Sequence, residues 1–331
     1  MQSRCKFYIC VLNFLFIPMT LGGQSTDDGS MVPRTNSGHP NFNGIWANNS
    51  ATPLERPAQL ANKESFTDEE LSALQDAAVR LFGGAGDAAF ADGVFLAALA
   101  ATEDFTSRDS GTGNYSSVWM VDRDFDARTS LITSPTNGQL PTLTNAANER
   151  QIAASKAYLE NNYAGPENLP LQVRCITYGI PRIGGFGGGY NSYYQIFQTE
   201  NHIVMIGEMI HDARIIPISD HPHIDQNITQ WHGDARGHWE GDTLVVETKN
   251  FDEKSNYLGS SNHLHLVERF TRVGSETLHY EITVTDPTTW QTSWTALAIL
   301  TGTTDAGFEY ACHEGNYGME GILTGARALE N

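Results

Sequence analysis

Two stretches, residues 264–272 (LHLVERFTR) and residues 277–285 (TLHYEITVT), have a clear strand pattern. Apolar and polar side chains alternate along both stretches, and a short segment that contains Gly274 separates them. Successive side chains of a β-strand point to opposite faces, so this alternation predicts two strands that each bury one face. The many β-branched and aromatic residues favour the same assignment.

The same pattern continues through the chain beyond Cys175. Further strands are predicted at residues 193–198, 202–208, 214–218, 243–248, 293–300 and 308–312. Short strands at such close spacing are typical of antiparallel pairing in a β-barrel or a β-sandwich. The sequence contains no repeated unit, which disfavours a propeller or a solenoid.

The N-terminal half has a different character. Thr67 and Glu70 have the spacing of a capping box, which predicts a helix that begins at Thr67 and runs to about Phe82. A second helix is expected at residues 145–161, where Ala, Glu, Arg, Gln and Lys dominate. The predicted fold class is therefore mainly β with α additions. An antiparallel β-barrel or β-sandwich forms the C-terminal half at residues 171–331, and a helical and irregular N-terminal region at residues 41–170 packs on it.

The first residues have the order of a secretory signal peptide, with Arg4 and Lys6 before an apolar run at 7–21 and Gly22-Gly23 after it. An uncleaved anchor is the alternative. We expect residues 1–23 to be the signal peptide and residues 24–40, rich in Ser, Thr, Asp, Gly and Pro, to be a flexible leader. No later stretch has the ~20 apolar residues of a membrane helix. We therefore expect a secreted or periplasmic protein with no stable membrane insertion after cleavage.

The 331 residues include 39 Asp and Glu against 20 Lys and Arg, a formal net charge of −19. So acidic a chain repels phosphate backbones and anionic lipid headgroups, so we expect no nucleic-acid partner and no binding to membrane surfaces. The sequence also lacks the G-x-x-x-x-G-K-[ST] loop of nucleotide hydrolases and the G-x-S-x-G elbow of serine esterases. The expected partner is a small-molecule substrate, and the oligomeric state is left open.

Two of the four cysteines, Cys5 and Cys10, fall within the predicted signal peptide. The exported chain would keep Cys175 and Cys312, and an even pair in an oxidising compartment favours one disulfide bond. A reactive thiol is the alternative, and it requires a lowered thiol pKa and a nearby base.

All but one of the eleven histidines lie between His202 and His313. Two H-x-H pairs, His221 with His223 and His263 with His265, would each place two imidazoles on one face of a strand, where they could bind a metal ion. Imidazole also exchanges protons near neutral pH, which makes these residues candidates for acid–base catalysis. The structural alternative is a set of hydrogen-bonded surface histidines.

Charged and aromatic side chains accompany these histidines along residues 191–240. The carboxylates of Glu208 and Asp212 are candidates to orient an imidazole or to act as bases. Arg214 is a candidate to hold an anionic group. The other candidate substrate-binding residues are Asn191, Tyr194, Trp231 and Trp239.

Six stretches spread over the chain resemble a large family of secreted bacterial proteins, common in acidobacteria and proteobacteria and mostly hypothetical. They are residues 52–57 (TPLERP), 128–132 (RTSLI), 208–217 (EMIHDARIIP), 233–246 (GDARGHWEGDTLVV), 264–270 (LHLVERF) and 310–316 (YACHEGN). The resemblance covers nearly all of the expected mature chain. It implies no particular activity.

The resemblance does imply something about single residues. Cys175 and Cys312 occupy cysteine positions of the family, which supports the disulfide. His223 and His265 match family histidines, whereas His221 stands where the family has arginine and His263 where it is variable. This departure weakens the metal interpretation and favours an imidazole that works with carboxylates. The residues His211, Asp212 and Arg214 belong to one matching stretch.

The expected function is that of a secreted, cofactor-independent enzyme, a lyase or a hydrolase, that acts on a small, partly apolar organic molecule by histidine and carboxylate acid–base chemistry. The proton-transfer candidates are His211, His223 and His265, with Glu208 and Asp212 as orienting groups or bases. No metal ligand is assigned. Two alternatives remain, a non-catalytic β-barrel that binds an apolar ligand and a metal-dependent enzyme that uses His223 and His265.

Overall fold

A computed structural model describes residues 31–82, 93–100, 123–161, 163–183, 190–255, 257–305 and 307–330. The expected signal peptide at residues 1–23 and the first part of the expected leader lie outside these ranges. No helix in the described ranges has both the length and the apolar character needed to cross a membrane.

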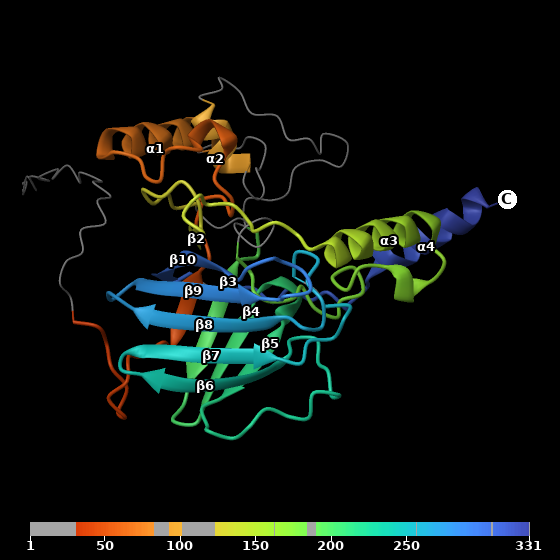
Figure 1. The fold of residues 1–331 in the computed structure, drawn as a ribbon. Helices are drawn as coiled ribbons and strands as arrows, with labels where there is room; N and C mark the ends of the chain where they lie inside the picture. Colours follow the sequence, from red (N-terminus) through yellow and green to blue (C-terminus); the bar gives the residue numbers. More distant parts are fainter. Residues whose placement is uncertain are drawn as a thin grey trace, which may run out of the picture.

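Ten strands of the described chain form one sheet whose strand pairs are antiparallel (Figure 1). The order along the sheet is β5-β4-β3-β1-β10-β9-β8-β7-β6, and β2 pairs with β10 beside this path. The fold class predicted from the sequence, mainly β with α additions, is confirmed. The strands are β1 (Gly44–Ala47), β2 (Ile132–Ser134), β3 (Tyr193–Gln198), β4 (His202–Gly207), β5 (Ala213–Pro217), β6 (Asp234–Glu240), β7 (Thr243–Lys249), β8 (His265–Arg272), β9 (Thr277–Thr285) and β10 (Trp294–Thr303).

The alternation in β8 and β9 produces the buried face of the sheet. The two strands pair from His265 opposite Thr285 to Arg272 opposite Leu278. Phe270 and Tyr280 face each other in this ladder, and their rings stack with centroids 4.7 Å apart. The other inward side chains of β8 and β9 belong to the main hydrophobic core, which the sheet encloses. This core also contains the large side chains of Trp46, Trp294, Phe42 and Phe251.

The sheet bends back on itself without closing. The two edge strands approach where Ile218 and Gly237 form a single parallel bridge, and the Ser219 N–H donates to the Gly237 carbonyl at 3.1 Å. A Cβ atom at Gly237 would stand 2.7 Å from Ile218 Cδ1, so glycine permits this approach. The expectation of a closed β-barrel is wrong, because the edge strands share one bridge and no ladder; the sandwich-like part of the expectation fits.

Four α-helices lie in the described ranges: α1 (Asp68–Phe82), α2 (Gly93–Leu99), α3 (Asn145–Asn161) and α4 (Tyr317–Leu329). The predicted capping box forms at the start of α1, where the Thr67 N–H donates to Glu70 Oε2 at 2.8 Å and the Glu70 N–H to Thr67 Oγ1 at 3.3 Å. Helices α1 and α2 share a small separate core above the sheet, whereas α3 and α4 project sideways (Figure 1). Short 3-10 helices occupy Ala58–Leu60, Pro166–Asn168 and Met209–His211.

Several sequence predictions differ from the structure. Residues 308–312 form no strand, because this segment is held by the Phe308 N–H, which donates to Glu208 Oε1 at 3.0 Å, and by the Cys312 sulfur. The strands β1, β2 and β6 and the helices α2 and α4 were not predicted from the sequence. The short β1 and β2 lie in the half of the chain that was expected to be helical and irregular.

Residues 31–40, which the sequence assigns to the flexible leader, contact the sheet. Arg34 forms a bidentate ion pair with Asp242 in the β6–β7 turn, at 2.8 and 2.6 Å. The His39 ring stacks on Trp239 with centroids 4.3 Å apart.

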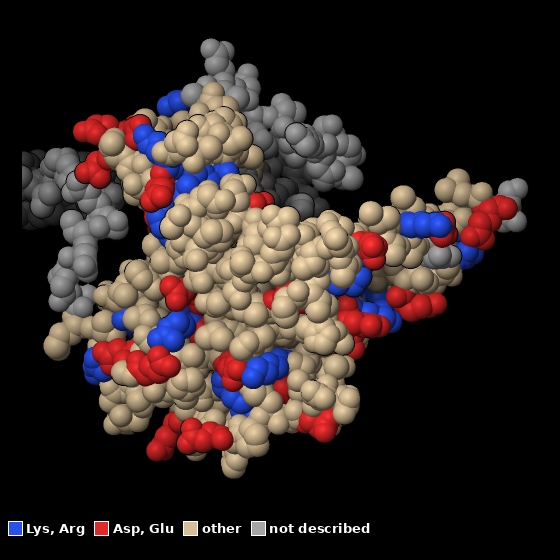
Figure 2. Space-filling model, viewed as in Figure 1, with Lys and Arg blue, Asp and Glu red and all other residues tan. Residues whose placement is uncertain are grey.

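On the face seen in Figure 2, acidic and basic side chains are interspersed over the sheet and do not gather into one basic stripe.

Candidate functional site

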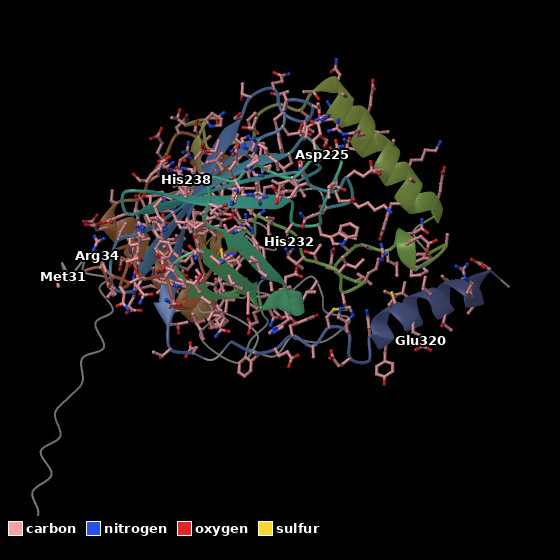
Figure 3. The ribbon with its side chains drawn as sticks, turned by 90° about the horizontal axis from the view of Figure 1, so that it is seen from below. Met31, Arg34, Asp225, His232, His238 and Glu320 are labelled. Atoms are coloured by element: carbon pink, nitrogen blue, oxygen red, sulfur yellow. A yellow bond between two sulfur atoms is a disulfide. The ribbon has the colours of Figure 1, made fainter. Side chains whose placement is uncertain are left out.

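Inward side chains at one end of the sheet surround a small cavity of about 30 Å³. Residues 179–182, which belong to no strand, also line it, and a surface groove of about 660 Å³ shares two of its lining residues. Arg214 and His232 line both spaces. Figure 3 shows His232 among the loops at the end from which α3 and α4 extend, whereas Arg34 and His238 lie toward the opposite end. The cavity is lined by Gly179, Ile180, Pro181, Arg182, Tyr194, Met205, Gly207, Met209, Asp212, Arg214, His232, Glu268 and Tyr280.

A buried ion pair forms one wall of the cavity. The guanidinium of Arg214 on β5 donates to Glu268 Oε1 at 2.9 Å and to Glu268 Oε2 at 2.5 Å, and its Nη2 also donates to Thr248 Oγ1 at 2.7 Å. The Tyr280 hydroxyl donates to Glu268 Oε1 at 2.8 Å. Burial alone would lower the pKa of Arg214, but the attraction of Glu268 outweighs it and holds that pKa above its ordinary value. Arg214 is therefore already paired with a carboxylate.

A second buried arginine, Arg182, has no carboxylate partner among the described residues. Its Nη2 donates to the Asn191 carbonyl at 3.2 Å, while its Nε and Nη1 form no hydrogen bond. The rings of Tyr178 and Tyr194 lie 5.0 and 6.0 Å from the guanidinium carbon. Burial raises the pKa of Tyr194 to about 12, so this ring is neutral at ordinary pH.

His232, Asp212 and Thr177 form a polar group at the boundary between cavity and groove. The Thr177 hydroxyl donates to Asp212 Oδ2 at 2.8 Å, and His232 Nε2 lies 2.6 Å from Thr177 Oγ1 and 3.5 Å from Asp212 Oδ2. The Tyr178 N–H also donates to Asp212 Oδ2, at 3.0 Å. Burial alone would raise the pKa of Asp212, but the contacts with His232, Thr177 and Tyr178 outweigh it and lower that pKa. Asp212 is therefore a carboxylate at neutral pH.

A disulfide holds the segment that carries Thr177 and Arg182. Cys175 and Cys312 are bonded, with their Cα atoms 5.6 Å apart, so the predicted pairing is confirmed. The Asn316 side chain adds a hydrogen bond to the Val173 carbonyl at 2.8 Å. The C-terminal segment thus anchors the chain segment that lines the cavity at residues 179–182.

A separate polar cluster lies on the outer face of the sheet, and we call it the outer cluster. Its members are His223, Asp234, Glu247, Lys249 and His265. His223 Nδ1 lies 2.9 Å from Asp234 Oδ2 and its Nε2 lies 3.3 Å from Glu247 Oε2. His265 Nε2 is 2.8 Å from Glu247 Oε1, although the contact lacks the alignment of a hydrogen bond.

Charge and burial set the protonation of the outer cluster. Hydrogen bonding to Lys249 is the main cause that lowers the pKa of Glu247, to about 2. Burial is the main cause that lowers the pKa of His265. His265 and Glu268 lie three residues apart on β8, so they point to opposite faces of the sheet, outward and inward. The outer cluster is therefore separated from the cavity by the sheet itself.

The predicted site residues are thus divided among several places. Asp212, Arg214 and Tyr194 line the cavity, and Trp231 lines the groove. His223 and His265 belong to the outer cluster and do not line the cavity: alternation along β8 sends His265 outward, and His223 lies in the loop before β6. His211 is exposed in the turn after β4. Asn191 is fully buried next to Arg182.

Two further candidate residues, Glu208 and Trp239, lie away from the cavity and make contacts that support the fold. Glu208 is buried, accepts the Phe308 N–H through Oε1, and does not line the cavity. Trp239 stacks with His39 and packs against the core. Five polar residues of the cavity region were not predicted from the sequence: Thr177, Arg182, His232, Glu268 and Tyr280. Of these, only His232 carried a signal, as one of the many histidines beyond residue 200.

Within the described ranges, no group of three or more His, Cys, Asp or Glu side chains is arranged to hold a metal ion. In the outer cluster, both ring nitrogens of His223 already face carboxylates and Lys249 contacts Glu247 at 2.6 Å. In this arrangement the His223 ring is engaged by the carboxylates of Asp234 and Glu247, and Glu247 is shared with Lys249 and His265.

Comparison of the chain with protein-family models, with curated proteins and with solved structures gave no significant match. The resemblance of the six sequence stretches to secreted bacterial proteins therefore stays a prediction.

Proposed function

We propose that the protein is an enzyme that transfers protons through His232 on a small organic molecule bound between the groove and the cavity. The observation that carries this proposal is the position of His232, which lines both spaces and contacts the Asp212 carboxylate and the Thr177 hydroxyl. A histidine, a carboxylate and a hydroxyl in mutual contact are the groups that general acid–base catalysis uses. The expected reaction classes stay those of a lyase or a hydrolase, exported and without a resident cofactor.

The hydrogen bonds define which nitrogen of His232 is basic. The Thr177 hydroxyl gives its proton to Asp212 and accepts the Gly179 N–H at 2.8 Å, so His232 Nε2 donates to the Thr177 oxygen. In the neutral ring, Nδ1 is then the atom with a free lone pair. Nδ1 would take the proton of the substrate or of a water molecule, and the Asp212 carboxylate would stabilise the imidazolium that results.

The lining of the cavity favours this proposal over the alternative of an apolar carrier. A carrier is expected to have a dry aromatic interior, whereas this cavity has two guanidinium groups, two carboxylates and an imidazole in its walls. The rest of the space inside the sheet is filled by the side chains of the main core. A wholly apolar ligand would leave the guanidinium of Arg182 without an acceptor for its Nε and Nη1.

The experiment is a substrate screen with matched histidine variants. The compounds are 4-nitrophenyl esters of short acids and small 2- and 3-hydroxy acids, assayed for hydrolysis and for elimination of water. We expect at least one to be turned over, and His232→Gln to reduce kcat by about 10²–10⁴-fold. The control His263→Gln changes an exposed histidine and should leave kcat unchanged. Equal turnover by both variants, or no turnover of any compound by the wild type, would count against the proposal.

A further inference from the structure

We propose that the buried Arg182 forms a subsite for the carboxylate group of a small organic acid, which makes such acids the substrate class of this cavity. This inference rests on the proposed function for the reaction at His232, but the binding of the acid itself does not depend on turnover. The structure places a guanidinium without a carboxylate partner on the wall of a cavity, beside the candidate proton-transfer group.

Arg182 is buried and only partly hydrogen-bonded. The residue is only 6% exposed, yet its Nε and Nη1 have no hydrogen-bond partner among the described residues. Nearly all buried polar groups of native proteins are hydrogen-bonded, and a buried charge is normally paired. The two tyrosine rings near Arg182 offer cation–π contacts, which leave the N–H groups free to donate. An anionic acceptor in the cavity would satisfy them.

The other charges of the cavity are already matched. Arg214 is paired with Glu268, and Asp212 is held by His232, Thr177 and the Tyr178 N–H. With His232 neutral, the two arginines and the two carboxylates that line the cavity sum to zero formal charge. Arg182 is thus the group in this set that lacks a close partner of opposite charge.

Charge and size indicate a carboxylate in preference to a phosphate. A bound monoanion brings the net formal charge of the cavity to −1, or to zero when His232 is protonated. A dianion adds two negative charges. The space of about 30 Å³ is small, which favours the smaller carboxylate group over phosphate. Arginine also matches the planar geometry of a carboxylate. The rest of the acid would extend past His232 toward the groove, which that residue also lines.

Gly207 keeps this space open. A Cβ atom at Gly207 would lie 3.5 Å from Arg182 Nη1, 3.8 Å from Tyr194 Cε1 and 3.9 Å from the Asp212 carbonyl oxygen. These are ordinary contact distances, so alanine fits at this position without displacing its neighbours. Gly207→Ala therefore fills part of the cavity while it leaves Arg182 in place.

The test is calorimetric titration at constant ionic strength with acetate and phenylacetate, their neutral amides acetamide and phenylacetamide, and inorganic phosphate. We expect the wild type to bind at least one acid about tenfold or more tightly than its amide. Arg182→Gln should remove this preference, and Gly207→Ala should weaken binding of the acid. Arg80→Gln removes an exposed arginine of α1 and should bind like the wild type.

Each outcome decides the proposal. The proposal is overturned if the wild type binds acid and amide equally, or if Arg182→Gln keeps the preference for the acid. It is also overturned if phosphate binds more tightly than either acid, or if neither acid binds. The last result would mean that the cavity holds only water. Circular dichroism checks that Arg182→Gln is folded, and Gly207→Ala gives an independent reading if it is not. His232→Gln should lose turnover but still bind the acid. Absence of acid binding would therefore count against the Arg182 subsite, whereas unchanged turnover in His232→Gln would count against the proposed function.

Discussion

Arg214 on β5 and Glu268 on β8 form a bidentate ion pair inside the sheet, although their strands are not neighbours in it. β5 is one edge of the sheet and β8 is the third strand from the other edge. The pair therefore connects the two ends of a sheet that hydrogen bonding between edge strands does not close. It also forms a wall of the cavity, so one interaction both supports the fold and shapes the site.

Replacement of one member of this pair should be strongly destabilising. Arg214→Met leaves the Glu268 carboxylate buried without its cation, and we expect a loss of about 3–5 kcal/mol in the free energy of unfolding. The double variant Arg214→Met/Glu268→Leu removes both charges and should lose less than the single one. Urea denaturation followed by tryptophan fluorescence measures both. A loss below about 1 kcal/mol for Arg214→Met would show that the pair does not hold the sheet.

Removal of the disulfide should destabilise the protein through the unfolded state. Cys175 and Cys312 are 137 residues apart in the sequence, and a cross-link over so long a loop stabilises by about 4–5 kcal/mol in the entropic description. We expect Cys175→Ser/Cys312→Ser to lose roughly this amount in urea denaturation. The wild type in reducing agent should approach the same value. Identical midpoints for oxidised and reduced protein would contradict the prediction.

Acid should weaken the outer cluster through Glu247. The pKa of this carboxyl is lowered to about 2 in the folded protein, so its contribution is present above the ordinary value of ~4.3 and is lost as the pH falls toward 2. The folding stability of the wild type should therefore decline more steeply over this range than that of Glu247→Gln. Glu247 is partly exposed, so solvent screening keeps the effect small. Glu253→Gln, at an exposed position, is the control; parallel pH profiles for all three proteins would refute the assignment.

Periodic features of the fold could be predicted from the sequence because they depend on local rules. The strands β3 and β9 and the helix α3 match their predicted ranges, and the capping box of Thr67 and Glu70 forms as expected. β6 was missed because its outward positions are charged and its interior contains Gly237. That glycine is explained by the approach of Ile218, which directly follows β5, a contact that no local pattern indicates.

The site was harder to predict because its members meet only in three dimensions. The H-x-H pairs drew attention to His223 and His265, and alternation along β8 sends His265 to the outer face. His232 stands alone in a loop, and its role depends on Thr177 and Asp212, which lie far from it in the sequence. Arg182 has no motif at all; its importance comes from burial without a carboxylate partner among the described residues.

Asp212 should act through His232 as a positioning residue. Asp212→Asn keeps the size of the side chain and removes the charge that would stabilise an imidazolium. We expect kcat to fall by about 10²-fold or more on a compound that the wild type turns over, with a smaller change in KM. The pH profile of kcat should also shift, because the charge beside the imidazole is gone. An unchanged pH profile would mean that Asp212 has only a structural role.

The role of His232 in proton transfer is tested most sharply by comparing the two histidine groups on one compound. Turnover of the same substrate is measured for His232→Gln, which alters the cavity, and for His223→Gln and His265→Gln, which alter the outer cluster. We expect kcat to fall by about 10²–10⁴-fold for the first variant and to stay near the wild-type value for the other two. Full activity of His232→Gln together with loss of activity in the outer-cluster variants would contradict this expectation and would place the chemistry on the outer face of the sheet.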